Sequence, residues 1–232
     1  LPELPEWIEP RLFDKMQWPA WRDALLLVHK GEHEAARDRL AYDELLANSL
    51  ALMLVRNANR AKVGTPLAGD GQLRAKLRLP FALTGAQGRS IAEIEGDMAQ
   101  AAPMLRLLQG DVGSGKTLVA ALAMARAAEA GMQSALMAPT DLLARQHGAS
   151  IMPLLEAAGV SAAVLTGRDK GKERKAILER MAKGELAVVI GTHALFQDEV
   201  AFNDLGLIVI DEQHRFGVSD RMRMVAKGFA PH

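Results

Sequence analysis

The sequence predicts an α/β fold with a mostly parallel sheet that is covered by helices on both faces, preceded by a mainly helical segment. Three observations support this fold class. From residue 80 onward, short apolar runs alternate with helical stretches. The runs are apolar at successive positions, which is typical of parallel strands buried on both faces. A glycine follows each of three helical stretches, where a helix is expected to end.

The apolar runs predict five strands, at residues 104–108, 134–137, 162–165, 187–190 and 207–210. The intervening stretches predict helices at about residues 116–130, 141–158 and 172–183. These helices are followed by Gly131, Gly159 and Gly184. Strands that alternate with helices in this way favour one doubly covered sheet over residues 80–232.

Residues 1–79 are expected to form a separate, mainly helical inter-domain segment that ends in a basic linker. A short helix is predicted after Pro19, because proline is favoured in the first turn of a helix. A longer helix is predicted at about residues 32–56, with an apolar stripe expected to pack against a neighbouring domain. Glycine, proline and basic side chains in residues 57–79 favour a solvated linker, with a DNA-facing surface as the alternative.

The composition excludes several classes of protein. The 232 residues include 28 basic and 28 acidic side chains, so any nucleic-acid site must be a local patch. The chain has no cysteine, which excludes disulfides and thiolate metal sites and is compatible with a bacterial cytoplasm. No apolar run is long enough to span a membrane. Because the chain begins with Leu1 rather than methionine, we expect it to be a fragment.

A phosphate-binding loop is predicted directly after the first expected strand. The sequence GDVGSGKT matches G-x-x-x-x-G-K-[ST]. Its glycines allow tight turns and let the backbone approach phosphate. Lys116 is expected to contact the β- and γ-phosphates of ATP, and Thr117 to offer its hydroxyl to Mg²⁺. An incidental glycine-rich turn is the alternative. The predicted nucleotide contacts in this loop are Gly110, Asp111, Val112, Gly113, Ser114, Gly115, Lys116 and Thr117.

A second acidic motif follows the last predicted strand. Asp211 and Glu212 come directly after it, where ligands bind in parallel sheets. Asp211 is expected to hold Mg²⁺ directly or through water, and Glu212 to orient or deprotonate the attacking water. Gln213 and His214 complete the sequence DEQH. An Asp-Glu pair alone often only caps a strand or helix, so this prediction depends on the phosphate loop.

These motifs together resemble superfamily-2 helicases, and among them the RecG family of bacterial DNA helicases. The resemblance rests on the stretches LPFALTGAQ, GDVGSGKT, APTDLLARQH, LTGR, GTHAL and IDEQHRFGV, and on RLAYDELLANSLAL before them. It implies that residues 80–232 form the first RecA-like P-loop motor domain, truncated at its end. It also implies that Gln87 recognises the adenine edge, with Phe81 nearby, and that Gln213 and His214 belong to the nucleotide site.

The resemblance also implies a set of DNA contacts on loops that follow the strands. Hydroxyls and arginines at such positions contact phosphates without reading bases. Each residue alone could instead be a helix cap or a surface charge, and Thr140 would be a good N-cap. Spacing gives His193 and His214 no support as metal ligands. The implied DNA contacts are Thr140, Arg145, Arg168, Thr192 and His193.

The implied activity is that of a monomeric ATP- and Mg²⁺-dependent DNA helicase or translocase that remodels branched DNA, such as stalled forks and Holliday junctions. Its partners would be branched or duplex DNA and, from the same parent chain, a second motor domain and a wedge domain that this sequence lacks. Two alternatives stay open. One is a nucleotide-binding module with negligible turnover by itself. The other is a related transcription-repair coupling translocase, although that family has a second acidic residue in place of Gln213.

Overall fold

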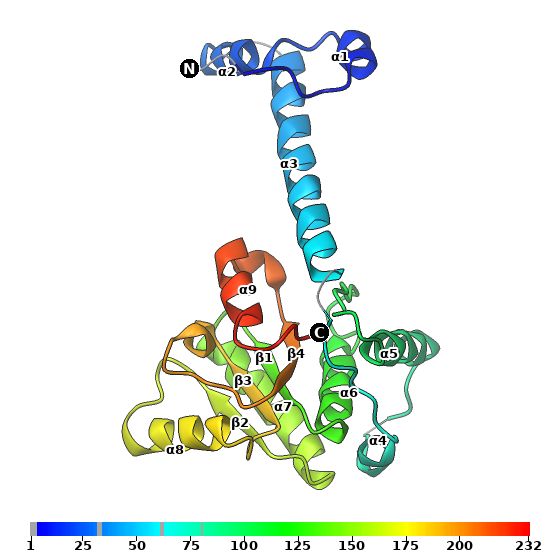
Figure 1. Ribbon diagram of the computed structural model, residues 1–232, viewed down its shortest axis with the longest axis vertical. Helices are drawn as coiled ribbons and strands as arrows, with labels where there is room; N and C mark the ends of the chain where they lie inside the picture. The colour runs from blue at the N-terminus through cyan, green and yellow to red at the C-terminus, as the bar shows by residue number, and fades with distance from the viewer. Residues whose placement is uncertain (1–3, 32–33, 61–62, 80) are drawn as a thin grey trace. The chain divides into compact units, whose positions relative to one another are not determined.

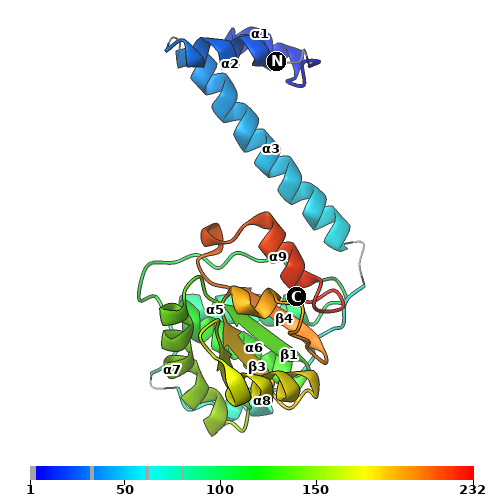
Figure 2. The same ribbon diagram turned by 90° about the vertical axis from the view of Figure 1, so that its left-hand side faces the viewer.

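The computed structural model describes residues 4–31, 34–60, 63–79 and 81–232, without the side chains of residues 52, 55–60, 214 and 218–221. The chain divides into two compact units, Leu1–Ala58 and Asn59–His232. The first unit is helical and the second is an α/β domain (Figures 1 and 2). Throughout the described ranges, no helix has the combination of length and apolar character needed to cross a membrane.

The first unit contains the helices α1 (Pro10–Met16), α2 (Trp21–His29) and α3 (Glu34–Arg60). The two predicted helices are confirmed, although the expected start of the second at residues 32 and 33 lies outside the described residues. Helix α1 was not predicted. It begins with proline at its first position, and the side chain of Glu9 accepts a hydrogen bond from the Leu12 N–H.

A fully buried arginine, Arg39, organises the first unit. Its guanidinium donates hydrogen bonds to the carboxylate of Glu6 at 2.8 and 3.0 Å and to that of Asp43 at 2.9 Å. The rings of Trp7 and Phe13 lie 5.2 and 5.6 Å from its charged carbon. These interactions hold the segment before α1 and α1 itself against α3. The expected apolar stripe on α3 is buried only near its beginning.

The second unit contains a parallel sheet, as predicted. Its strands are β1 (Gln133–Met137), β2 (Ala162–Leu165), β3 (Val188–Gly191) and β4 (Leu205–Ile210), in the order β2-β3-β1-β4. All three pairings are parallel. The carboxyl ends of the four strands therefore lie along one edge of the sheet, which is where ligands bind in this architecture.

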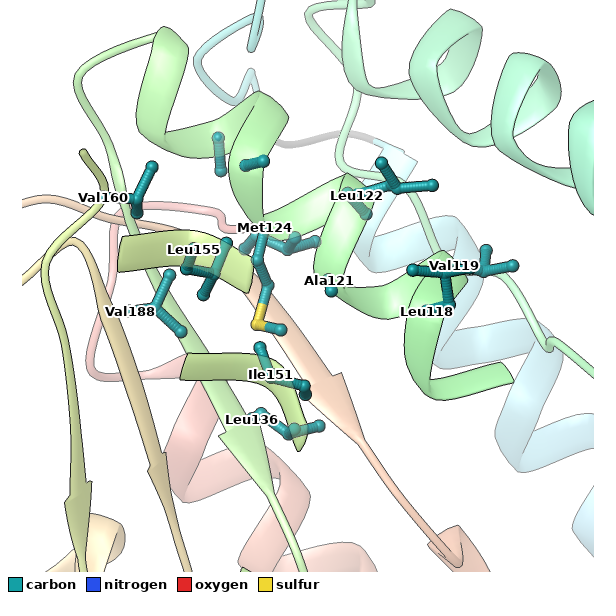
Figure 3. Packing of buried hydrophobic residues seen from close by; sticks show 14 of the residues in the cluster. Leu118, Val119, Ala121, Leu122, Met124, Leu136, Ile151, Leu155, Val160 and Val188 are labelled. Atoms are coloured by element: carbon teal, nitrogen blue, oxygen red, sulfur yellow. The ribbon is translucent and has the colours of Figure 1, made fainter. Parts of the chain in front are cut away.

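Helices cover both faces of this sheet. One core joins α5 (Gly85–Met98), α6 (Lys116–Glu129) and α7 (Asp141–Ala157) to one face, and Figure 3 shows Met124, Ile151 and Leu155 packed over Leu136 and Val188. A second core joins the other face to α8 (Gly171–Ala182), the 3-10 turn η1 (His193–Phe196) and α9 (Val218–Val225). The remaining elements are α4 (Gln72–Lys76) and the 3-10 turn η2 (Gln213–Arg215). The predicted fold class is confirmed.

The strand predicted at residues 104–108 is wrong, because the structure assigns no strand to this segment. The reason lies at the edge of β4. His232 occupies this edge, where its N–H donates to the Gly206 carbonyl and its carbonyl accepts from the Ile208 N–H, both at 2.8 Å. The N–H of Met104 instead donates to the His232 ring at 3.1 Å. Residues 104–108 thus lie outside the hydrogen-bonded ladder.

The expected boundary at residue 79 also differs from the structure, since residues 63–79 belong to the second unit. Leu67 is fully buried in the core beside α5 and α6. The carboxylate of Glu129 accepts hydrogen bonds from the N–H groups of Gly71 and Leu73, and Arg126 donates to the Gly69 carbonyl. These two side chains of α6 hold a segment expected to be a solvated linker against the domain.

Candidate functional site

The predicted phosphate loop precedes α6, whose first residue is Lys116. Gly113 and Gly115 both have φ of +82°, a left-handed conformation that costs glycine nothing. The Lys116 ammonium donates to the carbonyl oxygens of Gly110 and Asp111 at 2.7 and 2.8 Å. The loop therefore wraps around the lysine side chain and holds its charge at the amino-terminal end of a helix, which itself favours anions.

Gln87 joins the start of α5 to the phosphate loop. Its side-chain oxygen accepts from the Thr84 N–H at 2.9 Å, and the Thr84 hydroxyl accepts from the Gln87 N–H, which forms a capping box. Its amide nitrogen donates to the Ser114 carbonyl at 2.9 Å. A Cβ atom at Gly115 would lie well under 3.0 Å from this nitrogen. Glycine suits position 115 because of its left-handed φ angle, and a side chain there would displace the Gln87 amide from its hydrogen bonds.

The acidic motif continues the sheet beyond β4. The Asp211 N–H donates to the Met137 carbonyl at 2.9 Å, so the ladder fixes the backbone at this position. Glu212 is exposed and has φ of +49° and ψ of +51°. A non-glycine residue in this left-handed region costs on the order of 1–3 kcal/mol, and such strain is concentrated at functional sites. Gln213 is exposed in η2, and the side chain of His214 lies outside the described part of the chain.

The residues at this edge fit Mg²⁺ and a nucleotide. Mg²⁺ prefers oxygen ligands and is usually held by one or two protein groups together with phosphates and water. The Asp211 side chain is 29% exposed, and Thr117 is the second residue of α6. A Cβ atom at Gly113 would meet nothing within 4 Å, so the loop is open there. Within the described residues, no cluster of three histidine, cysteine or acidic side chains forms an all-protein metal site.

The DNA-side candidates lie around one depression at the carboxyl ends of β1, β2 and β3. We call it the α7 hollow. It has a volume of about 270 Å³, and four of the five predicted DNA contacts line it. The side chain of Arg168 is 81% exposed at its rim. The α7 hollow is lined by Pro139, Thr140, Asp141, Gly167, Arg168, Thr192 and His193.

The fifth candidate, Arg145, lies beside the hollow in a polar network. Its guanidinium donates to Asp141 and to Asp169, both at 3.1 Å, and to the Thr166 hydroxyl at 3.3 Å. Burial raises the pKa of Asp169, but the N–H and hydroxyl of Thr166 and the charge of Arg145 outweigh it and hold this pKa below its usual value. Arg145 is thus neutralised by two carboxylates and joins the start of α7 to the loop that follows β2.

The two threonines of the hollow are both helix caps. The Thr140 hydroxyl accepts from the Leu143 N–H at 3.3 Å, which confirms Thr140 as the N-cap of α7. The Thr192 hydroxyl accepts from the Ala194 N–H at 3.5 Å, and Thr192 is only 3% exposed. Thr192 therefore shapes the wall of the hollow, while Thr140, Arg168 and His193 are exposed at its surface.

Two contacts at this edge were not predicted. His147, which lies on α7, approaches Asp211 with 2.7 Å between Nε2 and Oδ2. The Phe216 ring, which follows the DEQH sequence, meets the Phe196 ring of η1 edge-on, with centroids 6.3 Å apart. No local sequence pattern indicates either contact, because the two partners of each contact lie on different elements.

Comparison with known proteins agrees with this geometry. Residues 84–230 match the DEAD/DEAH box helicase family. The chain is 47% identical over 240 residues to the ATP-dependent DNA helicase RecG of Acidithiobacillus ferridurans, covering 100% of this chain and 35% of the relative. It is 45% identical over 235 residues to RecG of Bacillus subtilis (strain 168), covering 98% and 34%. The chain thus spans about a third of the length of these curated relatives.

Solved structures give the same result. A structure of RecG bound to a three-way DNA junction superposes with a TM-score of 0.71 at 41% identity, covering 93% of this chain and 30% of that one. A hypothetical ATP-dependent RNA helicase from Sulfolobus tokodaii shares the fold, with a TM-score of 0.52 at 22% identity over 70% of this chain and 48% of that one. The family match covers more than half of the chain and includes the phosphate loop and the acidic motif. The chain therefore belongs to the DEAD/DEAH box helicase family.

Proposed function

We propose that this chain is the ATP-binding motor domain of a RecG-type DNA helicase that uses ATP hydrolysis to remodel branched DNA. One observation carries the proposal. The phosphate loop, the acidic motif and the α7 hollow all lie at the carboxyl edge of one parallel sheet. Helix α6 packs on β1 and β4, and a short turn joins its end to the start of β1, so the helix runs antiparallel to the strands. Its amino-terminal end, which follows the phosphate loop, therefore lies at the carboxyl edge.

In this proposal Lys116 binds the β- and γ-phosphates, exchanging the carbonyl oxygens of its own loop for phosphate oxygens. Thr117 and Asp211 hold Mg²⁺, which neutralises charge on the transferred phosphate when it is bound. Glu212 orients the attacking water and accepts its proton. Glu212 is exposed and has a left-handed backbone, while the ladder keeps Asp211 in place.

Adenine recognition by Gln87 is compatible with the contacts that its amide makes. An amide group offers two donor hydrogens and two acceptor lone pairs. One of each is used, by the Ser114 carbonyl and the Thr84 N–H. One donor and one lone pair thus remain for the adenine edge, although Gln87 is only 9% exposed. Phe81, which is 56% exposed a few residues earlier, offers an apolar face nearby.

We propose that the α7 hollow binds the phosphate backbone of DNA. The exposed Arg168 supplies charge and Thr140 and His193 supply polar contacts, which position a duplex without reading its bases. The similarity to RecG bound to a three-way DNA junction supports branched DNA as the partner. Because the chain spans about a third of its relatives, DNA remodelling is proposed for the whole protein. For the chain by itself we propose Mg²⁺-dependent nucleotide binding with little turnover.

The nucleotide assignment is tested by titrating a fluorescent ATP analogue into the chain with and without Mg²⁺. We expect Mg²⁺ to strengthen binding and Lys116→Ala to weaken it at least tenfold. Lys172→Ala is the matched control, because Lys172 is an exposed lysine in the first turn of another helix. Equal affinities for the wild type and Lys116→Ala, with both proteins folded by circular dichroism, would contradict the assignment.

The DNA assignment is tested by binding of a three-way junction over a range of salt concentrations. We expect Arg168→Ala to weaken binding and to reduce the slope of log affinity against log salt by about one, as the loss of one phosphate contact requires. Arg180→Ala is the control, since this arginine lies near the end of α8, at the opposite edge of the sheet. Equal slopes for wild type and Arg168→Ala would remove Arg168 from the interface.

A further inference from the structure

We propose that His147 is a positioning residue for nucleotide hydrolysis, which holds the Asp211 carboxylate in the orientation that receives Mg²⁺. This inference rests on the proposed function, because it assigns Asp211 to the metal. It is carried by the 2.7 Å contact between His147 Nε2 and Asp211 Oδ2. The two side chains are 14% and 29% exposed, so the contact is partly shielded from water.

The chemistry of the contact favours an orienting role. The carboxylate oxygen accepts the hydrogen bond, so Nε2 is the ring nitrogen that carries a hydrogen and donates this bond. Hydrogen bonds to an ionised group are stronger than neutral ones. The Asp211 backbone is already fixed by the bond from its N–H to the Met137 carbonyl. A bond to Oδ2 then fixes the remaining side-chain rotations and directs the carboxylate. Carboxylates that bind metal ions are themselves commonly held by such hydrogen bonds.

The backbone position of His147 is also fixed, in this case by the packing of its neighbours on α7. The next residue, Gly148, approaches β2 so closely that a Cβ atom would lie 2.5 Å from Val164 Cγ2. Valine is stiff about χ1, so this wall does not yield easily. Ala144 and Ile151, one turn away on either side, are 0% and 1% exposed and pack on the sheet. The imidazole is thus presented from a helix held at a defined height above the strands.

The same helix also forms part of the α7 hollow. Thr140 caps α7, and Thr140 and Asp141 line the hollow. Seven residues separate Thr140 from His147, a rise of about 10 Å at 1.5 Å per residue. The helix that positions Asp211 is therefore capped by one of the proposed DNA contacts, Thr140. Among the described contacts of Asp211, the hydrogen bond from His147 is the one that a residue of α7 makes.

The test compares three substitutions at His147. Glutamine keeps an N–H donor at a similar reach. Leucine fills a similar volume without a donor. Asparagine keeps the polarity but falls short of Asp211, and it serves if the leucine variant does not fold. Gln146→Leu is the control, because Gln146 is the exposed neighbour on the same helix.

The measurement is the Mg²⁺ concentration at half-maximal binding of the fluorescent ATP analogue, together with the affinity in the absence of Mg²⁺. We expect His147→Leu and His147→Asn to raise the Mg²⁺ midpoint about tenfold or more, the usual loss when such a supporting bond is removed. His147→Gln should stay within about threefold of the wild type, and Gln146→Leu should match it. The affinity without Mg²⁺ should not change in any variant.

Three results would overturn the proposal. A wild-type midpoint in His147→Leu or His147→Asn would show that the bond does not orient Asp211. A glutamine variant as impaired as leucine would assign the effect to packing of the ring. Equal weakening with and without Mg²⁺ would assign it to the nucleotide pocket as a whole. Failure of the proposed function gives a different result: wild type and Lys116→Ala would then both lack Mg²⁺-dependent binding, which overturns both proposals.

Discussion

Alanine at Gly115 should destabilise the second unit by about 2 kcal/mol more than alanine at Gly113, although both glycines have φ of +82°. The two positions differ in what a new methyl group would meet. At Gly113 a Cβ atom has nothing within 4 Å, whereas at Gly115 it would lie well under 3.0 Å from the Gln87 amide nitrogen. The pair therefore separates the effect of the backbone conformation from that of a close contact.

The magnitude follows from the contacts. A left-handed alanine costs about 1–2 kcal/mol, and the lower entropy of the unfolded chain returns part of it, so each change costs about 1 kcal/mol through the backbone. At Gly115 the Gln87 amide must also move away. It then loses its bonds to the Ser114 carbonyl and the Thr84 N–H, each worth about 1 kcal/mol. The expected totals are about 1 kcal/mol for Gly113→Ala and about 3 kcal/mol for Gly115→Ala.

The assay is urea unfolding followed by far-ultraviolet circular dichroism. All three tryptophans lie in the first unit, so tryptophan fluorescence follows that unit separately and should not change. In a Gln87→Ala background the extra cost of Gly115→Ala should disappear, because the contact is gone. Equal costs at Gly113 and Gly115, or an extra cost that persists without Gln87, would refute this explanation of the phosphate loop.

The acidic motif, helix α7 and the first unit each allow one more test. Glu212→Gln should lower steady-state ATP hydrolysis by the whole helicase by roughly 10²–10⁴-fold while Mg²⁺-dependent binding of the ATP analogue persists, and equal loss of both would contradict its role as the base. Gly148→Ala should cost about 1–3 kcal/mol in urea unfolding because its methyl meets Val164, and Val164→Ala should restore most of it; no restoration would exclude that clash. In the first unit, burial raises the pKa of Glu6, but hydrogen bonds and charge from Arg39 and nearby N–H groups hold it below its usual value of 4.5. Because the folded pKa is the lower one, this stability is present above about pH 4.5 and is lost as the pH falls through the folded pKa. Glu6→Gln should therefore flatten the acid dependence of the fluorescence-detected unfolding midpoint, and an unchanged dependence would argue against the ion pair.

Local signals predicted most of the second unit. Gly131, Gly159 and Gly184 all have positive φ at the helix ends where the sequence placed them. Four of the five predicted strands are present, each within two residues of its expected start. The phosphate loop could be identified for the same reason, because its eight residues are contiguous and each chemical role requires a particular residue type.

Errors arose where structure depends on distant residues. The apolar run at residues 104–108 indicated a strand, but pairing requires a free edge, and His232 lies on the edge of β4. The segment at residues 63–79 was predicted as a linker from its composition, but Glu129 binds its backbone from more than 50 residues away. Helix α5 is a different case. Its capping box, Thr84 with Gln87, was readable, but glycines within the helix weaken its helical pattern.

The contacts that join α7 and η1 to the acidic motif and the segment after it could not be predicted from the sequence, for the same reason. His147 and Asp211 are 64 residues apart, and nothing local to either one indicates the other. Phe196 and Phe216 form a second connection, in which η1 and the segment after the acidic motif pack edge to face. The first contact is made by a residue of α7 and the second by a residue of η1, and the N-cap residues of both elements line the α7 hollow. The hollow and the acidic motif are therefore joined by these two side-chain contacts as well as by the sheet, in which the Asp211 N–H donates to the Met137 carbonyl at the end of β1.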